Sequence, residues 1–73
     1  MIRKDYHGCT VEQAVDELHS LISSVRTSRL TEQVELITGT GPIHSALLST
    51  LAIYSLEANT KIGNSGSIIA IIE

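Results

Sequence analysis

Two short glycine-bearing turns constrain this chain more than any other feature, because each follows a strand pattern and opens a helix pattern. The first is Asp5-Tyr6-His7-Gly8 and the second is Thr38-Gly39-Thr40-Gly41. Strand–helix–strand units are right-handed, and the carboxyl ends of neighbouring parallel strands lie at one edge of the sheet. The sequence therefore predicts an α/β fold in which both turns meet at that edge.

Hydrophobic periodicity predicts the element order βαβαββ. Thr10 and Gln13 form a capping box, and apolar residues then recur at helical spacing as far as Val25. Pro42 suits the first position of a second helix, whose apolar stripe reaches Tyr54. The strands are expected at Ile2–Tyr6, Gln33–Thr38, Ala58–Ile62 and Ser67–Glu73, with a turn or short loop at Gly63–Gly66.

The side chains of the first and last strands predict where these strands lie in the sheet. Arg3 and Lys4 suit an edge strand, because inward-facing charges are costly in a sheet that is buried on both faces. Residues 68–72 are apolar on both faces, which favours an interior position for the last strand. If both helices cover one face, isoleucines such as Ile69 and Ile71 are expected to be exposed on the other.

Length and composition indicate a single domain over residues 1–73 with a thin aliphatic core. Chains of this size bury only about 60% of their unfolded surface. Tyr6 and Tyr54 are the only aromatic residues, so base-stacking platforms are nearly excluded. Eight acidic and five basic side chains leave a net charge of −3, which argues against nonspecific binding to a polyanion through a basic surface. Any nucleic-acid contact must be local.

Cysteine usage and hydropathy indicate the compartment. Cys9 is the only cysteine and cannot form an internal disulfide, and no segment has the length and flanks of a signal peptide or a membrane span. We therefore expect a cytoplasmic protein without membrane contact. Beside the helix start at Thr10, Cys9 is expected to be a small apolar turn residue, with a reactive thiol as the alternative.

Asp5 and His7 are the candidate catalytic residues. Alternate side chains of a strand point to the same face, so a carboxylate and an imidazole can act together there. Asp5 could hold a divalent metal or orient a water, and His7 could transfer a proton near neutral pH. The alternative is a structural pair that caps the strand end. No second acid lies near Asp5 in the sequence, so the metal and any cofactor stay unassigned. His19 lies far from this edge and is expected to be structural or exposed.

The glycines of the two turns and the nearby basic residues are the candidate contacts for a phosphate or other anion, with Gly8 in the first turn. The Thr38–Gly41 backbone lies at a helix N-terminus, where amides favour a phosphate, although a tight turn alone also demands such glycines. Arg3 and Lys4 could steer a phosphate backbone or serve only the solubility of an edge strand. His44 faces the same edge and could contact a phosphate when protonated or remain a solvated helix residue.

These motifs resemble those of the Smr, or small MutS-related, domain family. The family's first motif is Leu-Asp-Leu-His-Gly followed by a Thr-Val-x-x-Ala helix start, matched here by Lys4–Gly8 and Thr10–Ala14. Its second motif, His-Gly-x-Gly or Thr-Gly-x-Gly, is matched by Thr38–Gly41, and its last strand follows a glycine-rich loop, as in Gly63–Ile72. The resemblance covers nearly the whole chain, and the order and spacing of the motifs are together fairly specific.

The resemblance implies a two-layer sandwich with a four-stranded mixed sheet and both helices on one face, like the C-terminal domain of bacterial translation initiation factor three. It places the last strand antiparallel between the second and third strands. Smr domains bind nucleic acid, and several nick or cleave DNA or RNA. Carried over to this chain, the role in phosphodiester cleavage falls on Asp5, with His7 beside it, and substrate contact falls on Thr38–Gly41. The neighbouring candidates for nucleic-acid contact are then Arg3, Lys4, Gly8 and His44.

Several residues depart from the family pattern. Lys4 and Tyr6 replace the flanking leucines, Thr40 stands where a basic residue is frequent, and His44 takes the place of a common arginine. The loss of these cations predicts a weaker phosphate grip. Three functions are therefore open: an endonuclease that nicks DNA or cleaves RNA, a noncatalytic nucleic-acid-binding module, and a protein-interaction module that forms a homodimer through its open sheet face.

Overall fold

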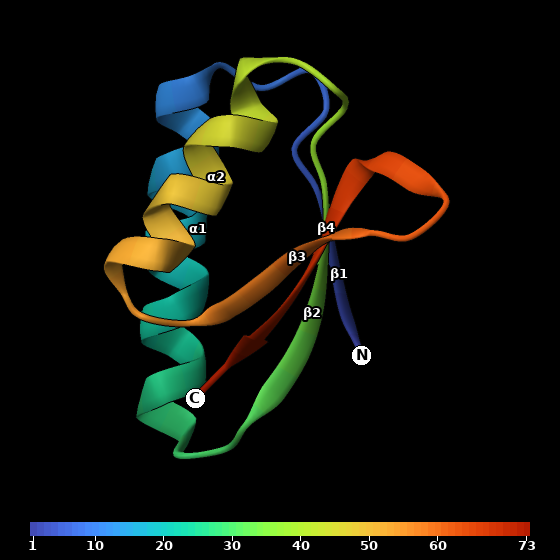
Figure 1. Ribbon diagram of the computed structural model, residues 1–73. Helices are drawn as coiled ribbons and strands as arrows, with labels where there is room; N and C mark the ends of the chain where they lie inside the picture. Colours follow the sequence, from blue (N-terminus) through green and yellow to red (C-terminus); the bar gives the residue numbers. More distant parts are fainter.

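The computed structural model describes residues 1–73, and its elements follow the predicted order βαβαββ (Figure 1). Other than at the start of the last strand, the strand ends lie within one residue of the predicted ones. The elements are β1 (Ile2–Asp5), α1 (Val11–Ser28), β2 (Glu32–Ile37), α2 (Pro42–Ile53), β3 (Glu57–Lys61) and β4 (Asn64–Ile72).

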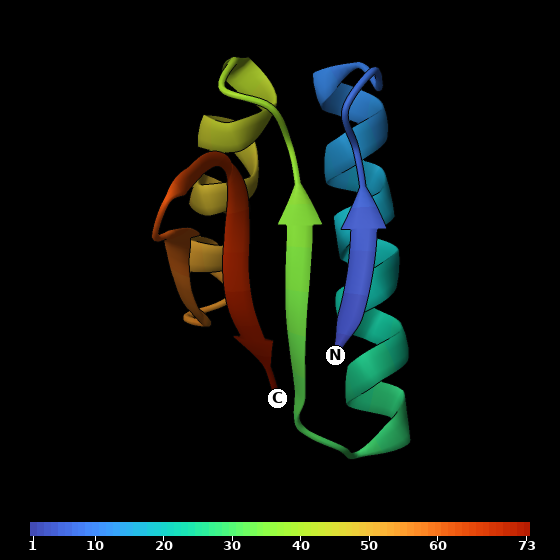
Figure 2. The ribbon, with the colours of Figure 1, turned by 90° about the vertical axis from the view of Figure 1, so that its right-hand side faces the viewer.

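The strands form one mixed sheet in the order β1-β2-β4-β3. β1 pairs with β2 in parallel, and β4 pairs antiparallel with both β2 and β3. Both helices lie on one face of the sheet, which leaves the other face open (Figures 1 and 2). The predicted two-layer α/β class is confirmed, with β1 at an edge and β4 in the interior.

Helix α1 begins where the sequence predicts, because Thr10 and Gln13 satisfy each other's backbone. The Thr10 hydroxyl accepts a hydrogen bond from the Gln13 amide at 3.1 Å, and the Gln13 side chain accepts one from the Thr10 amide at 2.9 Å. These bonds satisfy amides that would otherwise lack a partner in the first helical turn. The helix then buries one apolar stripe against the sheet, formed by Ala14, Leu18, Ile22 and Val25.

Helix α2 begins at Pro42, directly after the N-cap residue Gly41. Pro42 is tolerated there because the first helical position needs no amide hydrogen. The Thr50 hydroxyl, within the apolar stripe, donates to the Ala46 carbonyl at 2.9 Å. The stripe contributes Ile43, Leu47, Thr50 and Leu51 to the interior, whereas Ile53 on the outer side is 82% exposed.

The β3–β4 connection differs from the prediction. A loop was expected over Gly63–Gly66, but β4 already begins at Asn64, which leaves Ile62 and Gly63 as the turn. Gly63 takes the positive φ of 80° that such a tight turn needs. The pairing shifts between Thr60 and Lys61, so the hairpin contains a bulge, and its tip bends toward the open face of the sheet (Figure 1).

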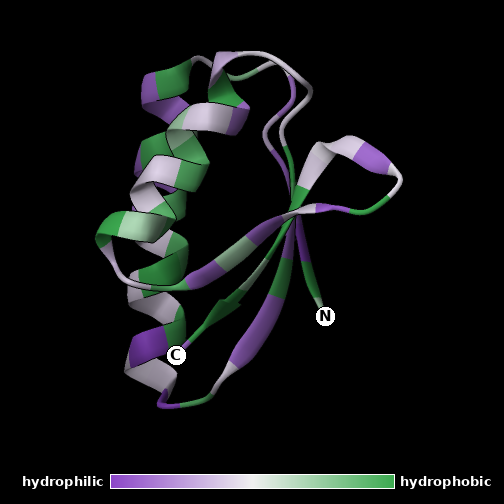
Figure 3. Cartoon of the chain, viewed as in Figure 1, coloured by the Kyte–Doolittle hydropathy of each residue, from purple (hydrophilic) through white to green (hydrophobic).

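One cluster of 13 buried residues fills the space between the helices and the sheet. Apolar residues on both helices and on β4 provide much of this layer (Figure 3). Ile69 and Ile71 lie on the open face as expected, but they are only partly exposed there. Glu35 is buried on the same face. Neither helix has the length and apolarity required to cross a membrane.

Candidate functional site

The structure brings the two glycine-bearing turns together at the carboxyl ends of β1 and β2. The Tyr6 amide donates to the Ile37 carbonyl at 2.7 Å, so the parallel pairing continues up to the turns. The His7 ring then lies against Gly39, because a Cβ atom added to Gly39 would be 3.7 Å from His7 Cδ2. The juxtaposition predicted from the βαβ pattern is therefore present.

Asp5 orders the first turn through the backbone. Its Oδ1 atom accepts a hydrogen bond from the His7 amide at 2.9 Å, and both residues are exposed. Such a bond between an aspartate and the amide two residues later is a common way to hold a turn. The carboxylate and the imidazole do not hydrogen-bond to each other. The structural alternative for Asp5 is thus realised in part, while its second oxygen stays exposed at the edge.

Gly66 on β4 is the third backbone segment that contacts this edge. Its carbonyl oxygen accepts hydrogen bonds from the amides of Thr38 at 2.8 Å and Gly39 at 3.0 Å. A Cβ atom on Gly66 would lie 3.4 Å from the Gly39 Cα atom, so the two backbones are in van der Waals contact. Sequence reasoning placed Gly66 only in a connecting loop. These bonds continue the antiparallel pairing of β2 with β4 beyond Ile37 and Ser67.

The amides at the start of α2 point to anion binding at this edge. Gly41 makes no side-chain cap, and the first turn of α2 contains no acidic residue. The amides of Thr40, Gly41 and Ile43 donate to no acceptor within the chain, whereas the His44 amide bonds to the Gly41 carbonyl at 3.2 Å. Free amides at the positive end of a helix dipole favour an anion.

His44 is not the solvated helix residue that the sequence allowed. It is half-buried, and its Nδ1 atom lies 2.8 Å from the Thr38 hydroxyl. Its Nε2 atom lies 2.9 Å from the Thr60 hydroxyl on β3. Both ring nitrogens therefore have partners within the chain. No motif around Thr60 predicts this contact, because only the fold places Thr60 beside His44.

The two basic residues of β1 face different surroundings. Arg3 points to the open face, where its Nε atom lies 3.3 Å from Glu35 Oε1. Lys4 alternates to the other side and lines two shallow clefts together with Glu17. Lys61, which the sequence analysis missed, joins Arg3 by placing Nζ 3.1 Å from Glu35 Oε2.

Glu35 is a buried carboxylate that two cations neutralise. Its side chain is 4% exposed, and both of its oxygens are paired. The hydrogen bond from Lys61 lowers the pKa of the Glu35 carboxyl, as do the charges of Lys61 and Arg3, against the opposing effect of burial. Because both oxygens are occupied, Glu35 serves the sheet rather than offering a free carboxylate to a ligand.

A cleft of about 380 Å³ lies beside Asp5 on the side of α1, and its residues are Lys4, Asp5, Tyr6, Cys9, Gln13 and Glu17. Burial raises the pKa of the Tyr6 hydroxyl to about 12, with smaller contributions from the charges of Glu17 and Cys9. Cys9 packs against the core from this cleft, as expected for an apolar turn residue. No group of three or more His, Cys, Asp or Glu residues could hold a metal ion.

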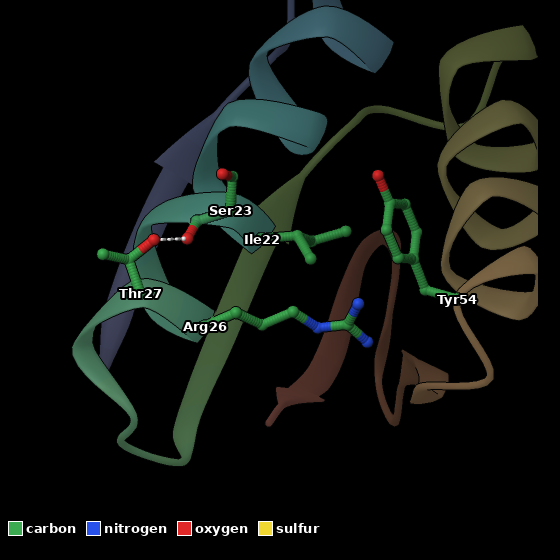
Figure 4. Close-up of a pocket in the computed structure, with 5 residues that line it drawn as sticks. All are labelled: Ile22, Ser23, Arg26, Thr27 and Tyr54. Atoms are coloured by element: carbon green, nitrogen blue, oxygen red, sulfur yellow. Dashed lines mark hydrogen bonds between the residues drawn. The ribbon is translucent and has the colours of Figure 1, made fainter.

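A second cavity, of about 370 Å³, lies far from the turns, between α1 and the end of α2 (Figure 4). The Arg26 guanidinium carbon lies 5.1 Å from the Tyr54 ring centroid, and Arg26 Nε donates to the Glu73 carbonyl at 3.1 Å. The Tyr54 hydroxyl lies 2.6 Å from Nδ1 of the exposed His19. These contacts tie the helices together, and His19 lies outside the edge, as expected.

Comparison with known proteins identifies the fold. No protein-family model and no curated protein sequence matches the chain. Among solved structures, it is similar to the crystal structure of the Smr domain of Thermus thermophilus MutS2, with a TM-score of 0.85 and 19% sequence identity. The match covers 100% of this chain and 99% of that domain. The chain therefore has the fold of an Smr domain, as its motifs predicted.

Proposed function

We propose that this Smr-like domain binds nucleic acid, with the phosphate backbone lying on the edge formed by Asp5–Gly8 and Thr38–Gly41. One observation supports this most directly: unpaired amides at the start of α2 lie at the edge where the His7 ring packs against Gly39. Backbone amides at a helix N-terminus bind phosphate oxygens without needing a basic surface. This mode suits a chain with a net charge of −3.

Basic side chains add to this contact from the sheet. Arg3 is 64% exposed at its side chain and Lys61 is 40% exposed, so both can approach a phosphate while remaining next to Glu35. Lys4 offers a further cation on the opposite side of β1. Gly8, with a positive φ of 93°, allows the first turn to approach a ligand closely. Binding is local to this end of the sheet.

A matched pair of substitutions at Thr40 tests the binding edge. Thr40 is exposed, so Thr40→Glu places a negative charge beside the free amides, and Thr40→Gln adds a side chain of similar size without the charge. We expect Thr40→Glu to weaken binding of labelled single-stranded DNA and structured RNA about tenfold or more, because the added carboxylate repels the phosphate and competes for the same amides. Thr40→Gln should bind like the unsubstituted chain in fluorescence anisotropy. Equal affinities for the two variants, or no binding at all, would overturn the proposal.

Phosphodiester cleavage is the second candidate function. The observation that favours it is the exposed Asp5 carboxylate, which the His7 amide orients at the same edge. An oriented carboxylate can position an attacking water or contribute to a divalent metal site, and His7 can transfer a proton. A single carboxylate is a poor metal site alone, so substrate phosphates would have to supply further ligands.

The test for cleavage uses supercoiled DNA, single strands and structured RNA, with and without a divalent metal. Asp5→Asn keeps an oxygen that can accept the His7 amide hydrogen bond but removes the charge, and it should abolish cleavage without unfolding the chain. His7→Gln should reduce it. If the unsubstituted protein binds but cuts none of these substrates, the domain is a noncatalytic binding module.

The homodimer predicted through the open face stays a prediction. Ile69 and Ile71 are partly accessible there, but the paired charges of Arg3, Glu35 and Lys61 share the same surface. Sedimentation equilibrium at high protein concentration distinguishes a dimer from a monomer. A dimer that dissociates on Ile69→Lys would support this arrangement, and a monomer would exclude it.

A further inference from the structure

We infer that His44 is the positioning residue of the second turn: its imidazole holds Thr38–Gly41 and the start of α2 in the arrangement that presents the free amides. This inference rests on the proposed nucleic-acid function and assigns His44 an indirect part in it. The sequence allowed a direct phosphate contact or a solvated side chain for this residue. The geometry supports neither of these.

The imidazole connects three separate elements. His44 belongs to the first turn of α2, Thr38 directly follows β2, and Thr60 lies in β3. The distances from the ring nitrogens are 2.8 Å to the Thr38 hydroxyl and 2.9 Å to the Thr60 hydroxyl. Thr38 is only 4% exposed, so water competes poorly for its bond to the ring.

The contacts of Thr38 determine which ring nitrogen carries the proton. The Thr38 hydroxyl lies 2.7 Å from the Gly39 carbonyl oxygen and 3.2 Å from the Gly66 carbonyl oxygen. Carbonyl oxygens only accept, and the hydroxyl has one hydrogen, so it must donate to a carbonyl and accept from His44 Nδ1–H. In the neutral ring, Nε2 then accepts from the Thr60 hydroxyl.

This arrangement also survives protonation of the ring. An imidazolium donates from both nitrogens, and the Thr60 hydroxyl can rotate to accept in place of donating. The hydrogen-bond partners of the ring, Thr38 after β2 and Thr60 in β3, are not titratable. With both nitrogens occupied in either state, the ring has no free donor or acceptor for a direct hydrogen bond to a phosphate.

Amide protection tests the positioning role without any ligand. The amides of Thr38 and Gly39, which bond to the Gly66 carbonyl, report the geometry of the turn. We expect Thr60→Val to speed their hydrogen exchange about tenfold, because it removes the hydroxyl that holds the ring. Thr60→Ser retains a hydroxyl and should keep the exchange rates of the unsubstituted chain. His44→Ala should have a larger effect, and the Tyr6 amide serves as the unaffected reference. Unchanged protection of Thr38 and Gly39 in both Thr60→Val and His44→Ala would overturn the inference.

One further measurement tests the hydrogen-bond assignment of the ring. Nitrogen-15 shifts of the neutral ring should identify the proton on Nδ1, and a proton on Nε2 would contradict the hydrogen-bond assignment.

These experiments distinguish the two proposals. If the unsubstituted chain binds no labelled DNA or RNA, the proposed function fails, whereas the amide protection still decides the role of His44. If binding occurs, His44→Asn should bind more tightly than His44→Ala, because its amide can replace the bond from Nδ1 to Thr38. Equal affinity of the two variants would show that this bond does not serve binding.

Discussion

At the scale of single residues, Gly39 is the residue of the binding edge whose backbone conformation and contacts can be tested most directly. It has a positive φ of 71°, its amide bonds to the Gly66 carbonyl at 3.0 Å, and the His7 ring packs over it. The nearest atom to an added Cβ is 3.7 Å away, which is ordinary van der Waals contact. A side chain therefore fits in space, and the cost of one arises from the backbone conformation.

Gly39→Ala should lower the free energy of unfolding by about 1–2 kcal/mol, the usual cost of a left-handed backbone for a residue with a Cβ atom. Gly39→Asn should lower it less, because asparagine tolerates positive φ better. Urea denaturation measures both changes. Equal losses for the two variants would indicate that side-chain crowding, rather than backbone conformation, sets the cost.

At the scale of elements, the capping box sets the start of α1 and so the length of the first turn. Thr10→Ala removes the hydroxyl that accepts from the Gln13 amide and should destabilise the domain by about 1 kcal/mol. Thr10→Ser retains the hydroxyl and should stay close to the unsubstituted value in thermal unfolding. A Thr10→Ala variant of unchanged stability would show that water replaces the cap.

The sheet is joined across its open face by Glu35 on β2, with Arg3 from β1 and Lys61 from β3. Because β4 lies between β2 and β3, the Lys61 side chain reaches Glu35 across β4. The pKa of Glu35 is lowered in the folded state, so the Glu35 carboxylate binds a proton more readily in the unfolded chain than in the folded one. The two ion pairs of Glu35 therefore stabilise the fold at pH values above the ordinary glutamate pKa of about 4.3.

This stabilisation should be lost as the pH falls below about 4.3 and through the lower folded-state pKa of Glu35. The urea midpoint should decrease over that range, and Glu35→Gln should flatten the decrease while lowering the midpoint at neutral pH. Glu57→Gln, at an exposed position of β3, is the matched control and should retain the full pH dependence. An unchanged slope in Glu35→Gln would assign the acid sensitivity to other carboxylates.

At the scale of the whole molecule, a single core of 13 residues supports both helices and the sheet. A domain of this size has only a few kcal/mol of net stability, roughly 3–5. Leu47→Ala empties a fully buried position of α2 and should cost about 2–5 kcal/mol, enough to leave much of the chain unfolded. Ile53→Ala, at an exposed position of the same helix, should change stability by less than about 0.5 kcal/mol. Calorimetric melting compares the two, and similar melting temperatures would contradict this single-core description.

The sequence predicted the helices and the meeting of the two turns because these depend on local signals and on one general rule of handedness. The Thr10 cap, Pro42 and the apolar stripe of α1 each act within a few residues. The start of β4 was predicted three residues too late, because the bulge depends on how β3 and β4 pair. Likewise, the partial burial of Ile69 could not be inferred from the sequence, because it depends on its neighbours Glu35 and Asn59 on the adjacent strands.

The sequence by itself determined the element order, the edge that the two turns share and the helix starts, since short-range hydrogen bonds and periodic burial decide these features. Only the tertiary structure decided what surrounds that edge. Thr60 reaches His44 across 16 positions, Lys61 reaches Glu35 across 26, and Gly66 reaches Thr38 across 28. No local pattern encodes such contacts, because they form only after β4 inserts between β2 and β3 and bends its hairpin toward the open face.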